Sequence, residues 1–264
     1  MSATQPALFA QTSPLPTLSG FDVILVASSA GKDSQAMLDY VAQLAREAGV
    51  SERIVVLHND LGEVEWPGTS ELAREQAEHY GFRFEMRHRE QGLLLDQVRA
   101  RGMWPSAKAR YCTSDQKRGP ARKLITQLVR EQGLDRQARV LYCLGLRAQE
   151  SSGRAKKPVL ALDQSASSGV RQVTTWHPIL DWTEDEVWAR IHSSGVRYHW
   201  AYDKGMKRLS CSFCVLASRE DLECAARLRP DMAATYVALE AEIGHRFKAD
   251  LSMADIVAAA GGAA

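Results

Sequence analysis

The hydrophobic pattern of the chain is most regular between residues 21 and 45. Residues 21–27 form a nearly continuous aliphatic run, which is typical of a strand buried on both faces of a parallel sheet. Residues 28–34 are small and polar, and residues 35–45 then place apolar side chains along one stripe at helical spacing. The pattern predicts a central strand, a tight turn and a helix.

The same order of elements recurs downstream. Strand-like segments follow at residues 53–58, 82–86 and 139–146, and a helical pattern lies between the first two, at residues 69–80. We expect that helix to open with a capping box that starts at Thr69 or Ser70. Successive strand, helix and strand units favour an α/β fold with a doubly wound, mostly parallel sheet.

The composition of the remaining segments predicts the structure of the two ends of the chain and one long loop. The composition of residues 1–19 predicts a flexible lead-in, and that of residues 156–171 a mobile loop that could close as a lid. Thr183 and Glu186 predict a capped helix, and residues 219–257 predict two helices that serve packing or partner binding. The expected domains are residues 1–19, 20–200 and 201–264, the last small, helical and cysteine-bearing.

The turn at residues 28–34 has the properties of a phosphate-binding loop. It leaves the first backbone N–H groups of the helix unpaired at the positive end of the helix dipole, and Lys32 adds positive charge. Its spacing differs from that of a Walker loop, and ordinary strand-to-helix turns can have similar composition. Ligands in open α/β sheets lie beyond the carboxyl ends of the strands, which places Asp60 beside this turn.

Charge and cysteine content indicate the cellular compartment but do not identify the substrate. The 33 basic and 32 acidic residues give a net charge of +1, which neither favours nor excludes a nucleic-acid partner. No segment has the apolar length needed to cross a bilayer, so we expect no membrane association and a cytoplasmic location. There, clustered cysteines serve metal or redox chemistry more often than disulfides.

One segment departs from the neutral average. Residues 99–123 hold eight Lys and Arg against one acidic residue, a net of +7, with Trp104 and Tyr111 interleaved. Such a stretch can follow a phosphate backbone and stack bases, although charge runs alone are more often solvated surface. The candidate nucleic-acid contacts are Lys108, Arg110, Lys117 and Arg118.

Three cysteines are candidate metal ligands. Cys211 and Cys214 form a Cys-x-x-Cys pair, which is compatible with zinc, with a redox dithiol or with part of an iron–sulfur site. A second nearby pair for zinc is missing, and the pair lies too late in the chain for a thioredoxin-like dithiol. Cys112 is the natural distant third ligand.

Three other residues of reactive type are interpreted as structural. Cys143 lies within an apolar strand, and Cys224 lies in an amphipathic helix, although it remains a candidate fourth ligand. His177 is placed between tryptophans and next to Pro178, which is typical of a packed histidine.

Four separate motifs together resemble one family, the PAPS reductase-like superfamily of N-type (PP-loop) ATP pyrophosphatases. Residues 28–34 resemble its pyrophosphate loop, with Ala30 at a usual glycine position. The other matching stretches are Cys112 with Lys117 and Pro120, residues 145–154, and residues 178–188. The resemblance implies an adenine nucleotide alpha hydrolase-like fold.

The differences from the family indicate a branch. PAPS reductases use a cysteine in a Glu-Cys-Gly-Leu-His tail, but here no cysteine follows Cys224. Cluster-bearing APS reductases have a Cys-Cys pair where this chain has Tyr111 and Cys112. The chain therefore looks closest to the DndC-like and SspD-like proteins, which help to put sulfur into DNA as phosphorothioate.

This resemblance implies an enzyme that splits ATP into AMP and pyrophosphate and so activates an oxygen of a nucleic acid for sulfur incorporation. Lys32, Asp33 and Arg147 would be catalytic, with ATP and Mg²⁺ as cofactors. A 4Fe-4S cluster on Cys112, Cys211 and Cys214 would handle sulfur. The expected ATP contacts are Ser28, Ser29, Gly31, Lys32, Asp33, Ser34, Asp60, Arg147 and Arg154.

The implied partners are a cysteine desulfurase as sulfur donor, DNA or tRNA as substrate, and other subunits of a modification complex, and a homodimer stays open. Three alternatives remain. They are a sulfonucleotide (PAPS or APS) reductase, a tRNA thiolation enzyme, and a nucleotide-binding subunit without turnover.

Overall fold

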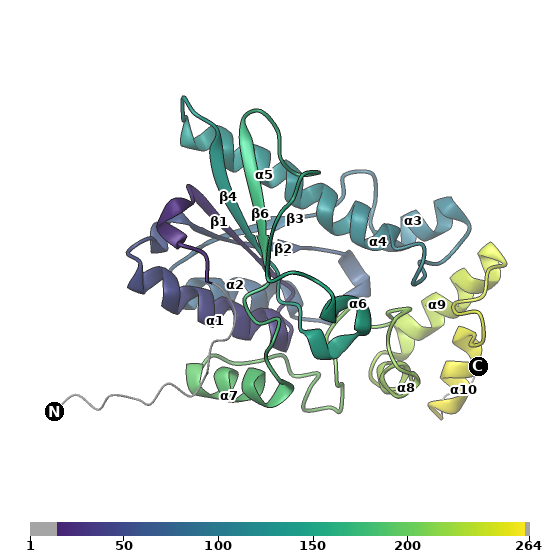
Figure 1. Ribbon diagram of the computed structural model, residues 1–264. Helices are drawn as coiled ribbons and strands as arrows, with labels where there is room; N and C mark the ends of the chain where they lie inside the picture. The colour runs from purple at the N-terminus through teal and green to yellow at the C-terminus, as the bar shows by residue number, and fades with distance from the viewer. Residues whose placement is uncertain (1–14, 262–264) are drawn as a thin grey trace.

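The structure is a computed structural model that describes residues 15–261 (Figure 1). Most of the predicted lead-in, residues 1–14, lies outside the described residues. The described part of the lead-in includes a single 3₁₀ turn, η1 (Leu18–Gly20), directly before the first strand. No helix among the described residues is long and apolar enough to cross a membrane.

The centre of the fold is a six-stranded sheet in the order β3-β2-β1-β4-β6-β5. Neighbouring strands from β3 to β6 pair in parallel, and only β5 runs antiparallel, at the edge. The doubly wound, mostly parallel sheet predicted from the sequence is confirmed. The strands are β1 (Val23–Ser28), β2 (Ile54–Asn59), β3 (Arg83–Arg87), β4 (Ala138–Cys143), β5 (Leu160–Leu162) and β6 (Arg171–Trp176).

Helices cover both faces of this sheet, which explains the unbroken apolar run of β1. Ile24 and Val26 share one core with α1 (Lys32–Glu47) and α7 (Glu184–Ser194), and α2 (Thr69–His79) adds to the same side. Val23 and Leu25 point into a second core, against α5 (Gly119–Gln132). Figure 1 shows α5 on the opposite side of the sheet from α1 and α7. Because both faces of β1 are buried, alternate residues on each face must be apolar.

A third core joins the C-terminal region to the middle of the chain. It contains Trp66, Trp104 and Tyr236, and the Trp104 and Tyr236 rings stack with centroids 5.0 Å apart. The C-terminal region has three helices where the sequence predicted two. These are α8 (Arg219–Leu228), α9 (Pro230–Ile243) and α10 (Met253–Ala259).

Short helical segments complete the chain. Three of them lie between β3 and β4: α3 (Leu94–Arg101), α4 (Tyr111–Thr113) and the π-turn η4 (Ser114–Arg118). The others are η2 (Ser51–Arg53), η3 (Gly62–Val64), η5 (Ala148–Glu150) and α6 (Ser152–Ala155).

Two local predictions are wrong and one is confirmed. Helix α2 is capped by Gly68, whose φ is +84°, and the Thr69 hydroxyl donates to the carbonyl of Trp66 instead of forming a capping box. The predicted lid, residues 156–171, contains the edge strand β5 and is therefore partly sheet. The capping box between Thr183 and Glu186 is present at the start of α7.

The sheet places the phosphate-loop candidate at its topological switch point. The chain runs outward from β1 to β3 and then returns to the other side of β1 as β4, so the loops after β1 and β4 lie side by side. Gly145, just after β4, approaches the start of α1 closely: a Cβ there would lie 3.0 Å from the carbonyl oxygen of Asp33. A side chain at position 145 would push the two loops apart.

Candidate active site

The loop of residues 28–34 is folded on its own hydroxyl groups. Ser28 Oγ accepts from the backbone of Ala30 at 3.2 Å, and Ser29 Oγ accepts from the backbone of Gly31 at 3.4 Å. Ser34 Oγ accepts from the backbone of Ser29 at 3.1 Å and donates to the carbonyl of Gly31 at 2.9 Å. The expected phosphate-binding amides are therefore gathered at the start of α1, and in this conformation hydroxyl groups occupy them.

Ala30 stands where the family usually has glycine, and its backbone shows why. Its φ is +53°, the one left-handed value of a non-glycine residue among residues 15–261. The residue is fully buried, and its methyl group packs against Leu72 and Ala73 of α2. Packing against α2 compensates for the strain of this conformation, which costs roughly 1–2 kcal/mol.

Four charges alternate beside the loop. Asp33 accepts from Arg147 Nε at 2.5 Å and lies 3.4 Å from Lys32 Nζ. Glu184, the first residue of α7, lies 3.8 Å from Lys32 Nζ and 3.5 Å from Arg147 Nη2. Lys32 and Arg147 are 2% and 3% exposed, whereas the Glu184 side chain is 52% exposed. Two buried cations thus lie beside the loop, and each is paired with carboxylates.

The sequence did not single out Glu184. The sequence indicates the position of Glu184 only through the capping box at Thr183, which fixes the start of α7 one residue before Glu184. Its approach to Lys32 depends on the packing of α7 against α1, which no local pattern predicts.

Asp60 and Arg154, both predicted ATP contacts, are engaged elsewhere. Asp60 follows β2, next to the loop, and its carboxylate accepts from the backbone of Gly62 at 2.7 Å. Arg154 pairs with Glu150, which also accepts from the backbone N–H of Arg147 at 3.1 Å. Arg154 therefore positions the segment that carries Arg147 in this conformation.

His58 is a buried residue of the site that sequence reasoning missed. Its Nδ1 lies 3.1 Å from the carbonyl oxygen of Ser28, and its Nε2 lies 3.0 Å from the carboxylate of Glu65. Because both partners are acceptors, the imidazole satisfies them best when both nitrogens carry a proton. Burial lowers the pKa of His58, but the hydrogen bond and charge of Glu65 outweigh it, so the pKa is raised overall.

A second hydrogen-bonded connection starts from Glu65. Its backbone carbonyl accepts from Arg229, whose guanidinium also donates to the hydroxyl of Ser212 at 2.7 Å. Ser212 lies between the two cysteines of the Cys-x-x-Cys pair. Ser28 is thereby connected to the cysteine segment through buried or half-buried polar groups.

The segment before the Cys-x-x-Cys pair covers the phosphate-loop candidate. The hydroxyl of Tyr202 accepts from the backbone N–H of Lys32 at 2.8 Å, and Lys32 Nζ donates to the carbonyl of Lys207 at 3.3 Å. Burial raises the pKa of the Tyr202 hydroxyl, while hydrogen bonds from the backbone of Lys32 and Leu209 act in the opposite direction. The backbone amide of Lys32 therefore has a phenol oxygen as its acceptor.

The three candidate cysteine ligands come together from α4 and from the loop before α8. Burial raises the pKa of the Cys112 thiol, and Cys214 raises it further, while Lys117 lowers it. Burial likewise raises the pKa of Cys211, Lys117 opposes this, and Cys214 and Cys112 add to it. The thiols are thus close enough to act on each other, and all are free.

The three thiols are donors of the chemical type that a 4Fe-4S cluster takes. Within residues 15–261, no group of three His, Cys, Asp or Glu side chains is close enough to hold one metal ion. Cys224 donates to the carbonyl of Lys204 at 3.4 Å and Cys143 is fully buried in β4, which agrees with their structural interpretation.

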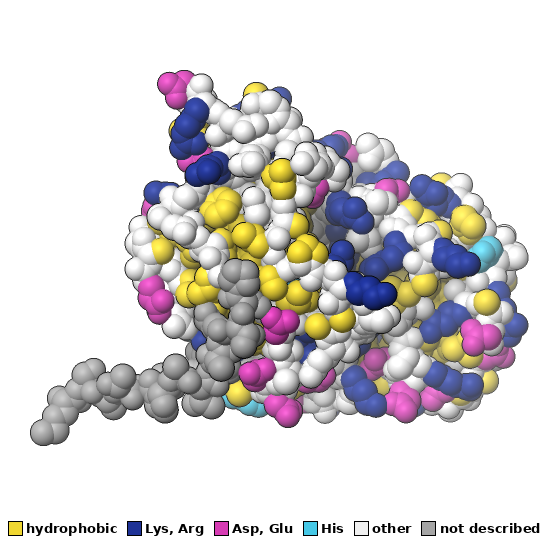
Figure 2. Space-filling view, in the orientation of Figure 1, with side chains coloured by type: hydrophobic (Ala, Val, Ile, Leu, Met, Phe, Trp, Pro, Cys, Tyr) yellow, Lys and Arg dark blue, Asp and Glu magenta, His cyan; other side chains and the backbone are white. Residues whose placement is uncertain are grey.

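The basic segment separates into paired and unpaired cations. Arg99, Arg101 and Lys123 form ion pairs with acidic residues. None of the four predicted nucleic-acid contacts forms an ion pair within the described part of the chain. Three of their side chains are exposed, and that of Lys117 is partly exposed. These four are Lys108, Arg110, Lys117 and Arg118. In Figure 2, Lys and Arg side chains gather over the half of this face where Figure 1 places α4 and the C-terminal helices.

The aromatic part of that prediction is wrong. Trp104 is 2% exposed and Tyr111 7% exposed, and both lie in the C-terminal core. Their rings pack within the protein and are not available to stack on bases. The segment needs these aromatic side chains to attach α3 and α4 to the C-terminal helices.

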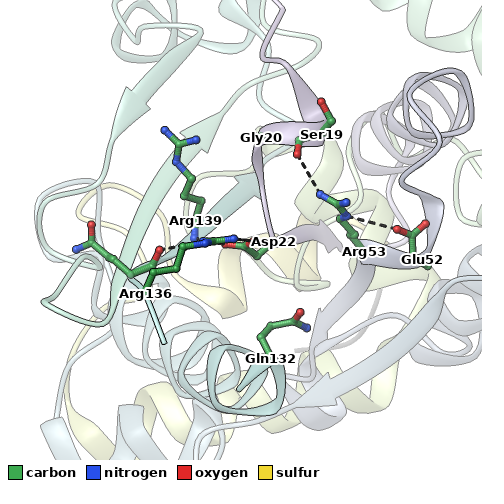
Figure 3. Close-up of a pocket in the computed structure, with 9 residues that line it drawn as sticks. Ser19, Gly20, Asp22, Glu52, Arg53, Gln132, Arg136 and Arg139 are labelled. Atoms are coloured by element: carbon green, nitrogen blue, oxygen red, sulfur yellow. Dashed lines mark hydrogen bonds and ion pairs between the residues drawn. The ribbon is translucent and has the colours of Figure 1, made fainter. Parts of the chain in front are cut away.

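A polar cavity of about 750 Å³ lies at the opposite edge of the sheet (Figure 3). Its lining includes Asp22, just before β1, and Arg139, at the start of β4. Asp22 forms a bidentate pair with Arg136 across it. Because this is the amino-terminal edge of the strands, the cavity is remote from the loops that follow β1 and β4.

Comparison with known proteins gives one family. Residues 23–217 match the phosphoadenosine phosphosulfate reductase domain. An uncharacterized protein of Escherichia phage 186 is 31% identical over 141 residues, which cover 53% of this chain and 40% of the phage protein. The adenosine 5'-phosphosulfate reductase of Allochromatium vinosum is 27% identical over 200 residues, 74% of this chain and 69% of the reductase. The chain thus spans less than half of the phage protein.

Two solved structures resemble the chain more distantly. One is a phosphoadenylyl-sulfate reductase from Candida auris, with a TM-score of 0.48, 18% identity, and coverage of 74% of this chain and 83% of that chain. The other is the U34-tRNA thiolase NcsA from Methanococcus maripaludis with its [4Fe-4S] cluster, with a TM-score of 0.47, 16% identity, and coverage of 91% and 71%.

Proposed function

Because the chain belongs to the phosphoadenosine phosphosulfate reductase domain family, matched over residues 23–217, we propose that it is an ATP pyrophosphatase that activates a nucleic-acid oxygen for sulfur incorporation. The observation that carries this proposal is the pair of buried cations, Lys32 and Arg147, beside a hydroxyl-lined loop at the start of α1. The proposed product is a DNA backbone phosphorothioate, as in the DndC-like proteins that the sequence resembles.

In the proposed reaction, the protein contributes mainly by positioning charged groups around the phosphates. A substrate oxygen attacks the α-phosphorus of ATP, the bond to the β-phosphate breaks, and pyrophosphate leaves. Backbone N–H groups of the loop, Lys32 and Arg147 neutralise the charge that develops on the phosphate oxygens. Asp33 orients Arg147 through their 2.5 Å contact. Asp33 and Glu184 offer the carboxylate oxygens that Mg²⁺ prefers, and Mg²⁺ would supply further charge neutralisation.

Sulfur would then replace the activated oxygen. A cysteine desulfurase supplies the sulfur as a persulfide, and two electrons from a thiol reductant release it at the oxidation level of sulfide. This sulfur nucleophile displaces AMP from the adenylated substrate. The thiolates of Cys112, Cys211 and Cys214 would hold a 4Fe-4S cluster, which leaves one iron open for a sulfur ligand when it is bound. Lys117, whose charge acts on two of these thiols, favours their thiolate forms.

The unpaired cations support a polyanionic substrate. Exposed cations without carboxylate partners attract phosphate backbones, and their displacement of counterions makes such binding salt-dependent. The four cations flank Cys112 in the chain, so a bound nucleic acid would lie beside the cysteines. Because phosphate contacts carry no sequence information, these residues suit DNA and tRNA equally.

A second candidate is a sulfonucleotide reductase. It is favoured by the similarity to the Allochromatium vinosum reductase over 74% of this chain. In that case the adenylated sulfate would occupy the loop, and the chain would release sulfite instead of pyrophosphate.

One set of assays separates the candidates. Anaerobically purified protein should convert ATP into AMP and pyrophosphate, and Lys32→Met should slow this by about 100-fold or more. The matched control is Arg46→Met, on the exposed side of the same helix, which should retain the rate. Sulfite release from APS or PAPS without pyrophosphate release from ATP would contradict the proposal in favour of the reductase.

The sulfur-handling part has its own test. Protein with the cluster should absorb broadly near ~400 nm, and Cys112→Ser should reduce this absorbance while Cys143→Ser should not. Mass spectrometry of DNA and tRNA from cells without the gene should show loss of phosphorothioate in DNA. Loss of a thiolated tRNA base alone would identify the tRNA alternative.

A further inference from the structure

The backbone amide that opens α1 is occupied by a side chain from far along the chain. In the proposed phosphate loop, three amides are satisfied by hydroxyls of the loop itself, but Lys32 N–H donates to the hydroxyl of Tyr202 at 2.8 Å. This amide is the first of the helix, where an anion is bound most favourably. A phenol oxygen therefore stands where an oxygen of a bound phosphate would stand.

The segment of residues 202–209 makes three contacts with the loop. Besides the Tyr202 hydrogen bond, Lys32 Nζ donates to the carbonyl of Lys207 at 3.3 Å. Gly31 is the third contact: a Cβ there would lie 3.3 Å from Leu209 Cβ and 3.4 Å from the Tyr202 hydroxyl. The absence of a side chain at Gly31 is what allows residues 202–209 to lie directly on the loop.

We propose that Tyr202 is a positioning residue whose hydroxyl is displaced from the Lys32 amide by a phosphate group of the bound nucleotide. This inference rests on the proposed function, because it requires the loop to bind the phosphates of ATP. Residues 202–209 are held on the loop by this hydrogen bond and by the contact of Lys32 Nζ with the Lys207 carbonyl, so we expect the segment to shift when the phosphate enters.

The shift has a direct consequence for the cysteines. Cys211 follows Leu209 by two residues, and the backbone N–H of Ser212 donates to the carbonyl of Val64 at 2.8 Å, which fixes Ser212. A movement of residues 202–209 is therefore absorbed between Leu209 and Ser212, at Ser210 and Cys211. Occupancy of the phosphate loop is coupled in this way to the position of one predicted cluster ligand.

Tyr202→Phe tests the displacement, and Tyr198→Phe is the matched control. Tyr198 belongs to the same aromatic cluster, with its ring 6.4 Å from that of Tyr202, but its hydroxyl donates to Asp203 and not to the loop. The probe is α,β-methylene-ATP, which cannot be split between its α- and β-phosphates. Without the competing hydroxyl, Tyr202→Phe should bind the probe about fivefold more tightly by calorimetry, and Tyr198→Phe should bind it like the unaltered protein.

Hydrogen exchange provides a readout that a purely structural role would not move. In the unaltered protein, the probe should protect residues 28–34 and speed exchange in residues 202–209. In Tyr202→Phe, residues 202–209 should exchange quickly before the probe is added and change little afterwards. Tyr198→Phe loses only an exposed hydrogen bond to the Asp203 side chain, so residues 204–209 should exchange in it as they do in the unaltered protein.

Two outcomes would overturn the inference, and they differ in what they say of the proposed function. If residues 28–34 are protected but residues 202–209 are not released, or if Tyr202→Phe binds the probe more weakly, Tyr202 stays in place and the inference alone fails. If the probe does not protect residues 28–34 in any variant, the phosphate site itself fails, and the proposed function and the inference are overturned together.

Discussion

At the scale of single residues, the site depends on groups that have a strained backbone or are buried in contact with a polar neighbour. Ala30 adopts a left-handed backbone, Arg147 is buried against Asp33, and His58 is held between a carbonyl and a carboxylate. Each of these costs free energy that the surrounding contacts must offset. Substitutions at these positions should therefore reveal how the loop is held.

Ala30 gives the first prediction. Ala30→Val adds β-branched bulk at a φ of +53° in a fully buried position, and should lower the free energy of unfolding by at least about 2 kcal/mol. Ala30→Gly relieves the backbone strain but loses a buried methyl group, so the two effects should nearly cancel, to within about 1 kcal/mol. Urea denaturation measures both. Equal losses for Val and Gly would show that the backbone conformation is not the determining factor.

The His58 and Glu65 pair gives a pH-dependent prediction. The folded protein raises the pKa of His58 above the ordinary 6.5, so the protonated pair stabilises the fold below that pH. This stability is lost as the pH rises through the raised pKa of the folded state. Glu65→Gln should therefore lower the free energy of unfolding more at pH 5.5 than at pH 8.5.

Urea denaturation at both pH values measures this difference. The matched control is Glu75→Gln, because Glu75 forms an exposed ion pair with Arg197 and has no contact with His58. Its effect should be small at both pH values. A larger loss for Glu65→Gln at pH 8.5 would mean that His58 is neutral in the folded protein.

At the scale of elements, the sequence predicts what local patterns determine and misses what tertiary contacts determine. The strand β1 was predictable because both of its faces are buried, and α7 because Thr183 and Glu186 cap it. The strand β6 follows a Ser- and Gly-rich stretch and has only two apolar residues, Val173 and Trp176, which do not alternate with polar ones. The strand β5 has only three residues, so neither strand has a clear local signal. The edge of the sheet was therefore mistaken for a lid.

The candidate site divides in the same way. The residues of the loop follow one another in sequence, so the sequence alone marks Lys32 and Asp33. Tyr202 contacts the loop from 170 positions away, and nothing around it in the sequence indicates that contact. Trp104 shows the opposite error, because its basic neighbours suggest an exposed ring and only the fold reveals that Tyr236 covers it.

The cap of α7 gives a prediction at this scale. Thr183→Ala removes the acceptor of the Glu186 backbone N–H and should lower the free energy of unfolding by about 1 kcal/mol. Ser193→Ala, at the other end of α7, removes an exposed hydroxyl that donates to Arg190, and should change it by less than about 0.5 kcal/mol. Urea denaturation of both variants measures the difference. Equal effects would show that the start of α7 is held by packing and not by its cap.

At the scale of the whole molecule, the fold brings three chemistries to one side. The loops after β1 and β4 carry the phosphate-binding candidates. Cys112 and Cys211 pack against the C-terminal core, and η4, directly after α4, carries Lys117 and Arg118. The net charge of +1 does not reveal this local excess of positive charge, because acidic residues elsewhere balance the unpaired cations. The distribution of charge, and not its sum, indicates a polyanion.

That distribution gives the final prediction. The double variant Lys108→Ala and Arg118→Ala removes two exposed cations without touching Lys117, which acts on the cysteines. If each contacts a phosphate, the slope of log K against log[salt] for duplex DNA should become shallower by about 0.9 per cation. The matched control is Arg46→Ala with Arg74→Ala, which removes the same charge from exposed positions on α1 and α2, across the sheet. The control should leave the slope unchanged. A general charge effect would alter the slope of both double variants alike, so equal slopes would contradict a defined binding surface. A shallower slope for the Lys108 and Arg118 variant alone would place the nucleic acid beside Cys112.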